Sequence, residues 1–185
     1  MVRDIFLFGN KVLRQVCEEV EKLDFDIRNL VIDLKDTLNH FKGYGLSAPQ
    51  IGILKRVFVI KREVGGNLTG EIIVMINPVF EDKNGGYQRG EEGCLSFPGF
   101  TRQITRPKLV SVYWMNEEGL FKREAFVGNE ARAICHENDH LNGKLIIDGV
   151  SEGKRKRAFR RYKKFFGSVL HPKIEREIEN EIHST

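Results

Sequence analysis

The sequence predicts an α+β fold, with small antiparallel or mixed sheets packed around a central helix that carries a His-Glu-x-x-His pattern. Segments rich in Val and Ile, separated by turn signals, are concentrated in the middle of the chain. Amphipathic segments that favour an N-terminal and a C-terminal helix lie towards the two ends. Strands and helices grouped in this way are typical of an α+β protein and not of an alternating βαβ protein.

Composition indicates an ordinary globular chain of 185 residues, long enough for one domain with a proper core. It is 41% hydrophobic and 30% charged, with a formal net charge of +4. No apolar run is long enough to span a bilayer, and no signal or transit segment is visible. Three cysteines without framework spacing favour a reducing compartment, so we expect a cytoplasmic protein with no membrane partner.

The first forty residues predict a short strand followed by two helices. Residues 1–8 are expected to form an edge strand, and Asn10 can cap a short helix after it. Asp24 or Asp26 opens an amphipathic helix, which Gly43 ends. Its apolar positions recur every three or four residues, as expected of a stripe that faces a core: Ile27, Leu30, Val31, Leu34, Leu38 and Phe41.

An irregular segment is predicted from Gly43 to Gly52, because glycines, small residues and Pro49 occur together there. Glycine allows the backbone to approach another group closely. The bland interpretation is a tight connection between a helix and a sheet. A phosphate-binding loop is poorly supported, since no Gly-Lys-Ser/Thr follows the glycines.

Strands and their turns occupy the centre of the chain. A hairpin turn is predicted at residues 83–86, and a second one at residues 116–119. The helix after the last strand is expected to begin at an Asn129 cap and to end at Asn142. The predicted strands are 56–61, 71–80, 109–115 and 120–127.

Residues 134–141 contain the His-Glu-x-x-His pattern. On a helix, His136 and His140 lie on one face, so both imidazoles can bind a single metal ion. Glu137 lies beside them and can take a proton from a water molecule that the metal activates. Two histidines on a helix can also be merely solvated, and a catalytic metal usually has a third protein ligand.

Cys94 is the best candidate for that third ligand, because it lies in a Gly-Cys-Leu-Ser turn at the end of a strand. Taken alone, Cys94 is more typical of a small buried hydrophobic residue. A metallopeptidase of the His-Glu-x-x-His type would instead need a ligand further downstream. Glu152 and His171 are available there, but no motif supports them.

Three segments have to be considered together: Gly43-Tyr44-Gly45-Leu46-Ser47-Ala48-Pro49-Gln50, Glu92-Gly93-Cys94-Leu95-Ser96 and His136-Glu137-Asn138-Asp139-His140-Leu141. They resemble the motifs of peptide deformylases, in that family's order and at about its spacing. The resemblance covers roughly residues 1–150. Ser47 stands where the family often has alanine, Cys135 where glutamine often precedes the first histidine, and Gly149 where many members have arginine.

The resemblance implies an enzyme that removes the formyl group from the initiator methionine of newly made polypeptides and releases formate. It implies that Cys94, His136 and His140 hold one divalent metal ion per chain. The ligand geometry by itself suggests zinc. The resemblance instead implies ferrous iron in the cell, with zinc, nickel or cobalt as ions that can be found or can substitute.

The resemblance also assigns roles to further residues. Glu137 takes a proton from water and then gives it to the leaving amine. The side-chain amide of Gln50 and the backbone N–H of Leu95 donate hydrogen bonds to the formyl oxygen. The Gly43-Tyr44-Gly45 segment pairs with the extended peptide as an added strand. The expected pocket for the methionine side chain consists of Tyr44, Glu92, Gly93, Arg132 and Ala133.

Several charged residues near these motifs have two interpretations. Arg132 can line the substrate pocket, or it can pair with a carboxylate in a structural role. Arg102 and Arg106 are candidate contacts at the rim, although surface arginines are usually just solvated. Asp139 faces away from the metal and can orient a histidine or neighbouring backbone.

The chain changes character after residue 150, where a dense basic run at 154–164 is interleaved with aromatic residues. We expect a catalytic domain at 1–150 and a basic helical extension of the same domain at 151–185, with a last helix near 172–182. The common interpretation of such a run is a solvated helix face. The functional interpretation is docking to ribosomal RNA, with no DNA partner. A non-catalytic ribosome- or RNA-associated relative is the alternative from another class.

Overall fold

The computed structural model describes residues 1–82 and 85–166. Its elements are η1 (Lys11–Arg14), α1 (Phe25–Phe41), β1 (Gly45–Ser47), η2 (Ala48–Ile51), β2 (Val57–Val64), β3 (Asn67–Asp82), β4 (Tyr87–Gly93), β5 (Thr101–Pro107), β6 (Leu109–Met115), β7 (Phe121–Val127), α2 (Gly128–Leu141) and α3 (Glu152–Phe166). One sheet has five antiparallel strands in the order β1-β2-β3-β6-β7, and β4 and β5 form a second antiparallel sheet. The predicted α+β class is confirmed.

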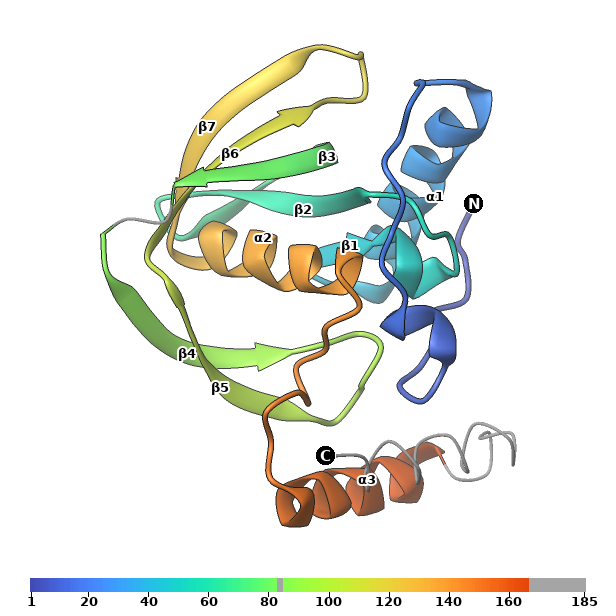
Figure 1. Cartoon of the computed structure of the whole chain (residues 1–185), viewed down its shortest axis with the longest axis vertical. Coiled ribbons are helices and arrows are strands. Elements are labelled where there is room, and N and C mark those ends of the chain that lie inside the picture. Colours follow the sequence, from blue (N-terminus) through green and yellow to red (C-terminus); the bar gives the residue numbers. More distant parts are fainter. Residues whose placement is uncertain (83–84, 167–185) are drawn as a thin grey trace.

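Helix α2 lies between the five-stranded sheet and the β4–β5 pair, and α3 lies beyond that pair (Figure 1). The first half of strand β2, residues 57–60, is buried on both faces, because α1 and α2 pack on opposite sides of its sheet. Val57 and Val59 join the cluster with α1, whereas Phe58 and Ile60 join the cluster with α2. Successive side chains of a strand point to opposite faces. A strand covered on both sides therefore has an unbroken apolar run.

The first two helices begin where the sequence predicts. Asn10 Oδ1 accepts a hydrogen bond of 3.1 Å from the Val12 N–H, which caps η1. Asp24 Oδ1 accepts one of 3.0 Å from the Ile27 N–H, which caps α1. The C-cap of α1 is Lys42 in the left-handed conformation (φ 54°), and the predicted Gly43 follows it.

The prediction of a hairpin at residues 83–86 is wrong. Strand β3 pairs with β2 and β6, whereas β4 pairs with β5, so the chain changes sheets between them. Gly85 and Gly86 adopt φ values of 78° and 76°, which glycine accommodates without steric cost. Strand β5 was not predicted, because Thr101–Pro107 lacks apolar alternation and is defined by its partner β4.

Two N-terminal predictions also need correction. Residues 1–8 contain no strand, since Phe6 and Phe8 make only isolated backbone hydrogen bonds, to Gln50 and Ser96. The segment 43–52 is more regular than predicted, because β1 pairs with β2 and η2 follows directly.

Helix α2 begins one residue before the predicted cap. Val127 is its N-cap and offers no side-chain hydrogen bond, and Gly128 is the first helical residue. Asn129 lies inside the first turn, where its Nδ2 donates to the carboxylate of Glu63 at 3.1 and 3.3 Å. The helix ends at Leu141, in agreement with the predicted stop.

Helix α3 packs its apolar face against the body of the molecule. Its buried residues Ala158, Phe159 and Tyr162 join a cluster that includes Phe8 and Phe97. The Phe97 ring is stacked on Phe8 and meets Tyr162 edge-on. The predicted last helix near 172–182 lies outside the described residues. Within residues 1–82 and 85–166, no helix is both long and apolar enough to cross a membrane.

We predict that Phe159→Ala lowers the free energy of unfolding by about 3 kcal/mol, because it leaves a cavity in this cluster. The neighbouring exposed Arg160→Ala should change it by no more than about 0.5 kcal/mol. Urea unfolding followed by tryptophan fluorescence measures both. Equal midpoints for Phe159→Ala and the parent chain would show that α3 does not contribute to the stability of the core.

Candidate metal centre and active site

Three metal-ligating side chains meet between β4 and α2. His136 and His140 are one turn apart on α2, and Cys94 directly follows β4. One ligand atom from each lies within 4.8 Å of the others, and Cys94 Sγ is 3.2 Å from His140 Nε2. We call Cys94, His136 and His140 the donor triad. A thiolate and two imidazoles on one side of an ion would leave a position open for water, as catalytic sites require.

Both histidines are buried. Burial alone would lower the pKa of His136, but hydrogen bonds with Cys94 and Glu92 outweigh it and raise that pKa well above its usual value, so an ion bound there would displace a proton. His136 Nδ1 lies 3.1 Å from Glu92 Oε2. A carboxylate only accepts, so Nδ1 carries the proton and Nε2 is left for a ligand. Burial lowers the pKa of His140 well below its usual value. The neutral imidazole that results is the form that binds metals. The donor triad therefore fits a divalent ion.

Glu137 is a buried carboxylate beside the donor triad. It is 3% exposed, and its Oε2 has no hydrogen-bond partner among the described residues. Burial raises its pKa to about 7, which suits a group that takes and returns a proton at neutral pH. Gly45 lies directly against it, since a Cβ there would be 2.5 Å from Glu137 Oε1. A side chain at residue 45 would displace the carboxylate.

Gln50 has a fixed side-chain orientation. Its Oε1 accepts hydrogen bonds of 2.9 Å from both the N–H and the hydroxyl of Ser47. Its Nε2 donates to Ser96 Oγ at 3.1 Å and points towards Cys94 Sγ at 3.6 Å. The Leu95 N–H makes no hydrogen bond to any described residue. An amide donor and a free backbone donor therefore lie next to Cys94.

These groups line a cavity of about 450 Å³. All residues predicted for the site except His140 line it, and His140 lies one turn along α2 from His136. Strand β1 is the edge of its sheet, so its unpaired side is available to an extended peptide. The lining residues from the prediction are Gly43, Tyr44, Gly45, Gln50, Glu92, Gly93, Cys94, Leu95, Arg132, Ala133, His136 and Glu137.

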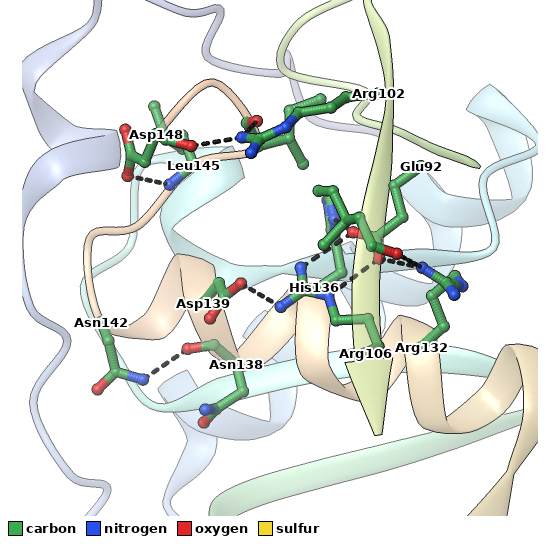
Figure 2. Close-up of polar contacts among 12 residues, drawn as sticks. Glu92, Arg102, Arg106, Arg132, His136, Asn138, Asp139, Asn142, Leu145 and Asp148 are labelled. Carbon is green, nitrogen blue, oxygen red and sulfur yellow. Dashed lines mark hydrogen bonds and ion pairs between the residues drawn. The ribbon is translucent and has the colours of Figure 1, made fainter. Parts of the chain in front are cut away.

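A buried ionic network supports this cavity (Figure 2). Glu92 accepts two hydrogen bonds of 2.9 Å from Arg106 and one of 2.7 Å from Arg132. Arg106 also donates to Asp139 at 2.6 Å. Burial alone would raise the pKa of Glu92, but hydrogen bonds from His136 and Arg106 outweigh it and lower the pKa to about 2. Glu92 is therefore ionised at any physiological pH.

The network decides between the interpretations of the nearby arginines. Arg132 pairs with the carboxylate of Glu92 and also donates to the backbone oxygens of Gln88, Gly90 and Ile104. This is the structural alternative, although the side chain still touches the cavity. The prediction that Arg106 lies at the rim is wrong, because its side chain is only 13% exposed. Asp139 holds Arg106 and no histidine.

The sequence analysis missed three polar residues at this site. Ser47 and Ser96 hold Gln50, and Asn129 lines the cavity. Ser47 and Ser96 belong to the first two motifs, so their place in the sequence could have identified them as site residues. Arg102, predicted at the rim, donates instead to the backbone oxygens of Ile146 and Asp148, as Figure 2 shows in part.

Comparison with known proteins agrees with this geometry. The family model for polypeptide deformylase matches residues 2–156. A peptide deformylase of Clostridium botulinum (strain Alaska E43 / Type E3) is 45% identical over 154 residues, which are 82% of this chain and 98% of the relative. The crystal structure of peptide deformylase from Ehrlichia chaffeensis has a TM-score of 0.84 at 34% identity and covers 92% of this chain and 100% of that chain. The structure from Ehrlichia chaffeensis in complex with actinonin has a TM-score of 0.81 at 36% identity, with 89% and 97% covered. The chain therefore belongs to the peptide deformylase family.

Proposed function

We propose that this peptide deformylase removes the N-formyl group of newly made polypeptides in the cavity beside α2, with the donor triad as the ligands of one divalent metal ion. One observation carries the proposal. A thiol and two buried imidazoles converge next to Glu137, a carboxylate whose pKa is about 7 and whose Oε2 has no partner among the described residues. The ion supplies a Lewis acid, which makes water more acidic and polarises a carbonyl group.

The residues around the ion would move the protons and stabilise the charge. Glu137 takes a proton from the attacking water and later returns it to the nitrogen of the departing amine. Its position against Gly45 keeps the carboxylate facing the cavity. The amide of Gln50, which Ser47 orients, and the N–H of Leu95 donate to the formyl oxygen as negative charge develops there.

The peptide substrate would bind along the free edge of β1. Gly43, Tyr44 and Gly45 offer backbone groups there, and the Tyr44 carbonyl already accepts from the Lys61 N–H on the other side. Backbone pairing of this kind gives affinity with little dependence on the side chains that follow methionine. The methionine side chain would enter the cavity near Gly93 and Ala133.

We propose ferrous iron as the ion in the cell. The donor set is compatible with zinc, iron, nickel and cobalt alike, so family resemblance carries this choice. Metal analysis of protein purified without oxygen tests it. We also propose a cytoplasmic location, supported by three cysteines that form no disulfide in the described part of the chain and by a substrate that ribosomes make.

A metallopeptidase is the weaker interpretation. Glu152, its candidate third ligand, pairs with Lys156 at 2.7 Å and has a half-exposed side chain on α3. His171 lies outside the described residues. The sulfur of Cys94 lies within 4.8 Å of a ring nitrogen of each histidine, which supports Cys94 as the third ligand.

We further propose that the basic C-terminal segment belongs to the same domain and docks the enzyme on the ribosome. The packing of Phe159 and Tyr162 into the cluster with Phe97 supports the first part. For the second, α3 carries exposed basic side chains, Lys156 and Lys164 among them, on the surface it turns to solvent. Such a surface attracts the phosphates of ribosomal RNA.

We predict that Glu137→Gln lowers kcat for formate release at least about 100-fold, because it removes the proton carrier. The variant should keep its metal, since no ligand is lost. Cys94→Ser should instead lose both metal and activity. Formate release from formyl-Met-Ala-Ser together with metal analysis separates the two, with an acetyl-Met-Ala-Ser control. A near-normal rate in metal-loaded Glu137→Gln would contradict the role.

We predict that Glu92→Gln lowers the free energy of unfolding by about 3–5 kcal/mol, because the buried Arg132 loses its paired carboxylate and the buried Arg106 keeps only Asp139. Metal affinity should fall about 10- to 100-fold, since Glu92 orients His136. The adjacent exposed Glu91→Gln should change stability by no more than about 0.5 kcal/mol.

The pH dependence has a defined sign. The pKa of Glu92 falls from 4.5 to about 2 on folding, so its contribution is complete above pH 4.5 and is lost as pH falls towards 2. Denaturant unfolding of the parent chain and Glu92→Gln at several pH values measures it. If the free energies of unfolding of the parent chain and of Glu92→Gln changed in parallel between pH 4.5 and about 2, the lowered pKa of Glu92 would be contradicted.

We predict that Lys156→Glu combined with Lys164→Glu weakens sedimentation with ribosomes and lowers its salt dependence by about one unit of log–log slope per lysine. Lys108→Glu combined with Lys122→Glu makes the same change in net charge on the strands and should bind as the parent does. Charge reversal is a sharper test than deletion of residues 151–185, which would also uncover the Phe97 cluster. Equal sedimentation of all three proteins would exclude docking by α3.

A further inference from the structure

A second hollow, of about 780 Å³, opens between α3 and the β4–β5 pair. Its lining includes five basic residues and no acidic residue: Arg89, Arg102, Lys154, Arg157 and Arg161. We call this hollow the basic cleft. Lys154, Arg157 and Arg161 are three and four residues apart on α3, so they share one face of the helix. Arg89 and Arg102 face them from the strands.

The positive charge of the basic cleft is not compensated from within the described part of the chain. None of its five cations forms an ion pair with a carboxylate whose placement the structure describes. Arg102 is held by the backbone oxygens of Ile146 and Asp148, which orient the guanidinium without neutralising it. Like charges gathered in a hollow repel one another and raise the local concentration of anions.

The basic cleft adjoins the active-site cavity. Both hollows are lined by Gly99, Phe100 and Thr101, so one short loop separates them. Thr101 Oγ1 donates to Glu91 Oε1 at 3.0 Å, and Glu91 lines the active-site cavity only. A polypeptide longer than a few residues, held at the active site, can therefore reach the cleft across this loop.

We propose that the basic cleft binds acidic side chains of the nascent polypeptide downstream of its formyl-methionine, so that the enzyme favours substrates with an acidic segment there. The inference rests on the proposed active site, because the substrate chain must start in that cavity. Once the formyl end is bound, the downstream segment meets the cleft at high effective concentration. Even weak, exposed ion pairs then add to affinity.

A peptide fits the observations better than a nucleic acid. A phosphate backbone that followed the cleft towards the active site would meet the exposed carboxylate of Glu91 within the adjoining cavity. A peptide carries charge only at particular residues and can pass that boundary with neutral ones. Apolar wall residues, such as Phe100, Val150 and Ala158, also suit a polypeptide.

The test uses the full-length, metal-loaded enzyme and formyl-Met-Ala-Ser peptides extended by a neutral spacer and a charged pair. An Asp pair, an Asn pair or a Lys pair is moved one residue at a time along the spacer. At low salt, one placement should give kcat/KM for Asp about 3- to 10-fold above Asn, through a lower KM. The difference should shrink as salt rises. For each protein, kcat/KM on an extended peptide is divided by kcat/KM on formyl-Met-Ala-Ser. The short peptide does not carry the charged pair, so its rate measures the active site alone.

Matched variants assign the effect to the basic cleft. Arg157→Glu should abolish the preference for Asp, and Arg157→Glu with Arg161→Glu should reverse it in favour of Lys. Arg160→Glu makes the same charge change three residues further along α3, at a position that does not line the cleft. This control variant should keep the preference for Asp peptides.

Three outcomes overturn the proposal. The first is equal kcat/KM for Asp, Asn and Lys peptides at every placement, with normal turnover of formyl-Met-Ala-Ser. The second is an equal effect of Arg160→Glu and Arg157→Glu, which would indicate net charge alone. The third is binding of a single-stranded RNA oligonucleotide that Arg157→Glu abolishes, without any effect of peptide charge, which would make the cleft a nucleic-acid site. If the metal-loaded parent enzyme did not release formate from formyl-Met-Ala-Ser at all, that result would instead refute the proposed function.

Discussion

The ionised carboxylate of Glu92 is the interaction on which the geometry of the site depends. Glu92 is 6% exposed, and its carboxylate accepts hydrogen bonds from Arg106, Arg132 and the imidazole of His136. These partners come from β5 and α2, so one anion joins the two-stranded sheet to the helix that carries the histidines. A buried anion of this kind is costly unless it is fully paired. The pairing holds both sides of the cavity in one relative position.

The active site also depends on two glycines whose backbone lies directly against charged side chains of α2. Gly45 on β1 leaves room for Glu137 on α2. On β4, Gly90 does the same for Arg132, since a Cβ there would lie 2.7 Å from Arg132 Nη2. Ser47 adds a second constraint by holding the amide of Gln50. The two glycines and the serine thus position Glu137, Arg132 and Gln50, although none of the three belongs to the donor triad.

Helix α3 serves different purposes on different faces. Phe159 and Tyr162 pack into the body of the molecule, Arg157 and Arg161 line the basic cleft, and further basic residues face solvent. The basic run at residues 154–164 is continuous in the sequence, but the helical repeat distributes its side chains over separate surfaces of α3. The surface that we propose for ribosome docking and the cleft that we propose for the substrate therefore consist of different side chains of the same helix.

The sequence by itself determined the fold class, the start of α1 at Asp24 or Asp26, the β6–β7 hairpin and three motifs of the peptide deformylase family. These features rest on local periodicity, turn chemistry and short-range spacing, which a sequence displays directly. Only the tertiary structure decided that β4 leaves the sheet of β3, that β5 exists, and that Arg106 and Arg132 surround Glu92. Partners far apart in sequence make these choices, because pairing and burial depend on which segments meet in space. The basic cleft is of the same kind, since Arg89 and Arg157 become neighbours only when α3 folds against the strands.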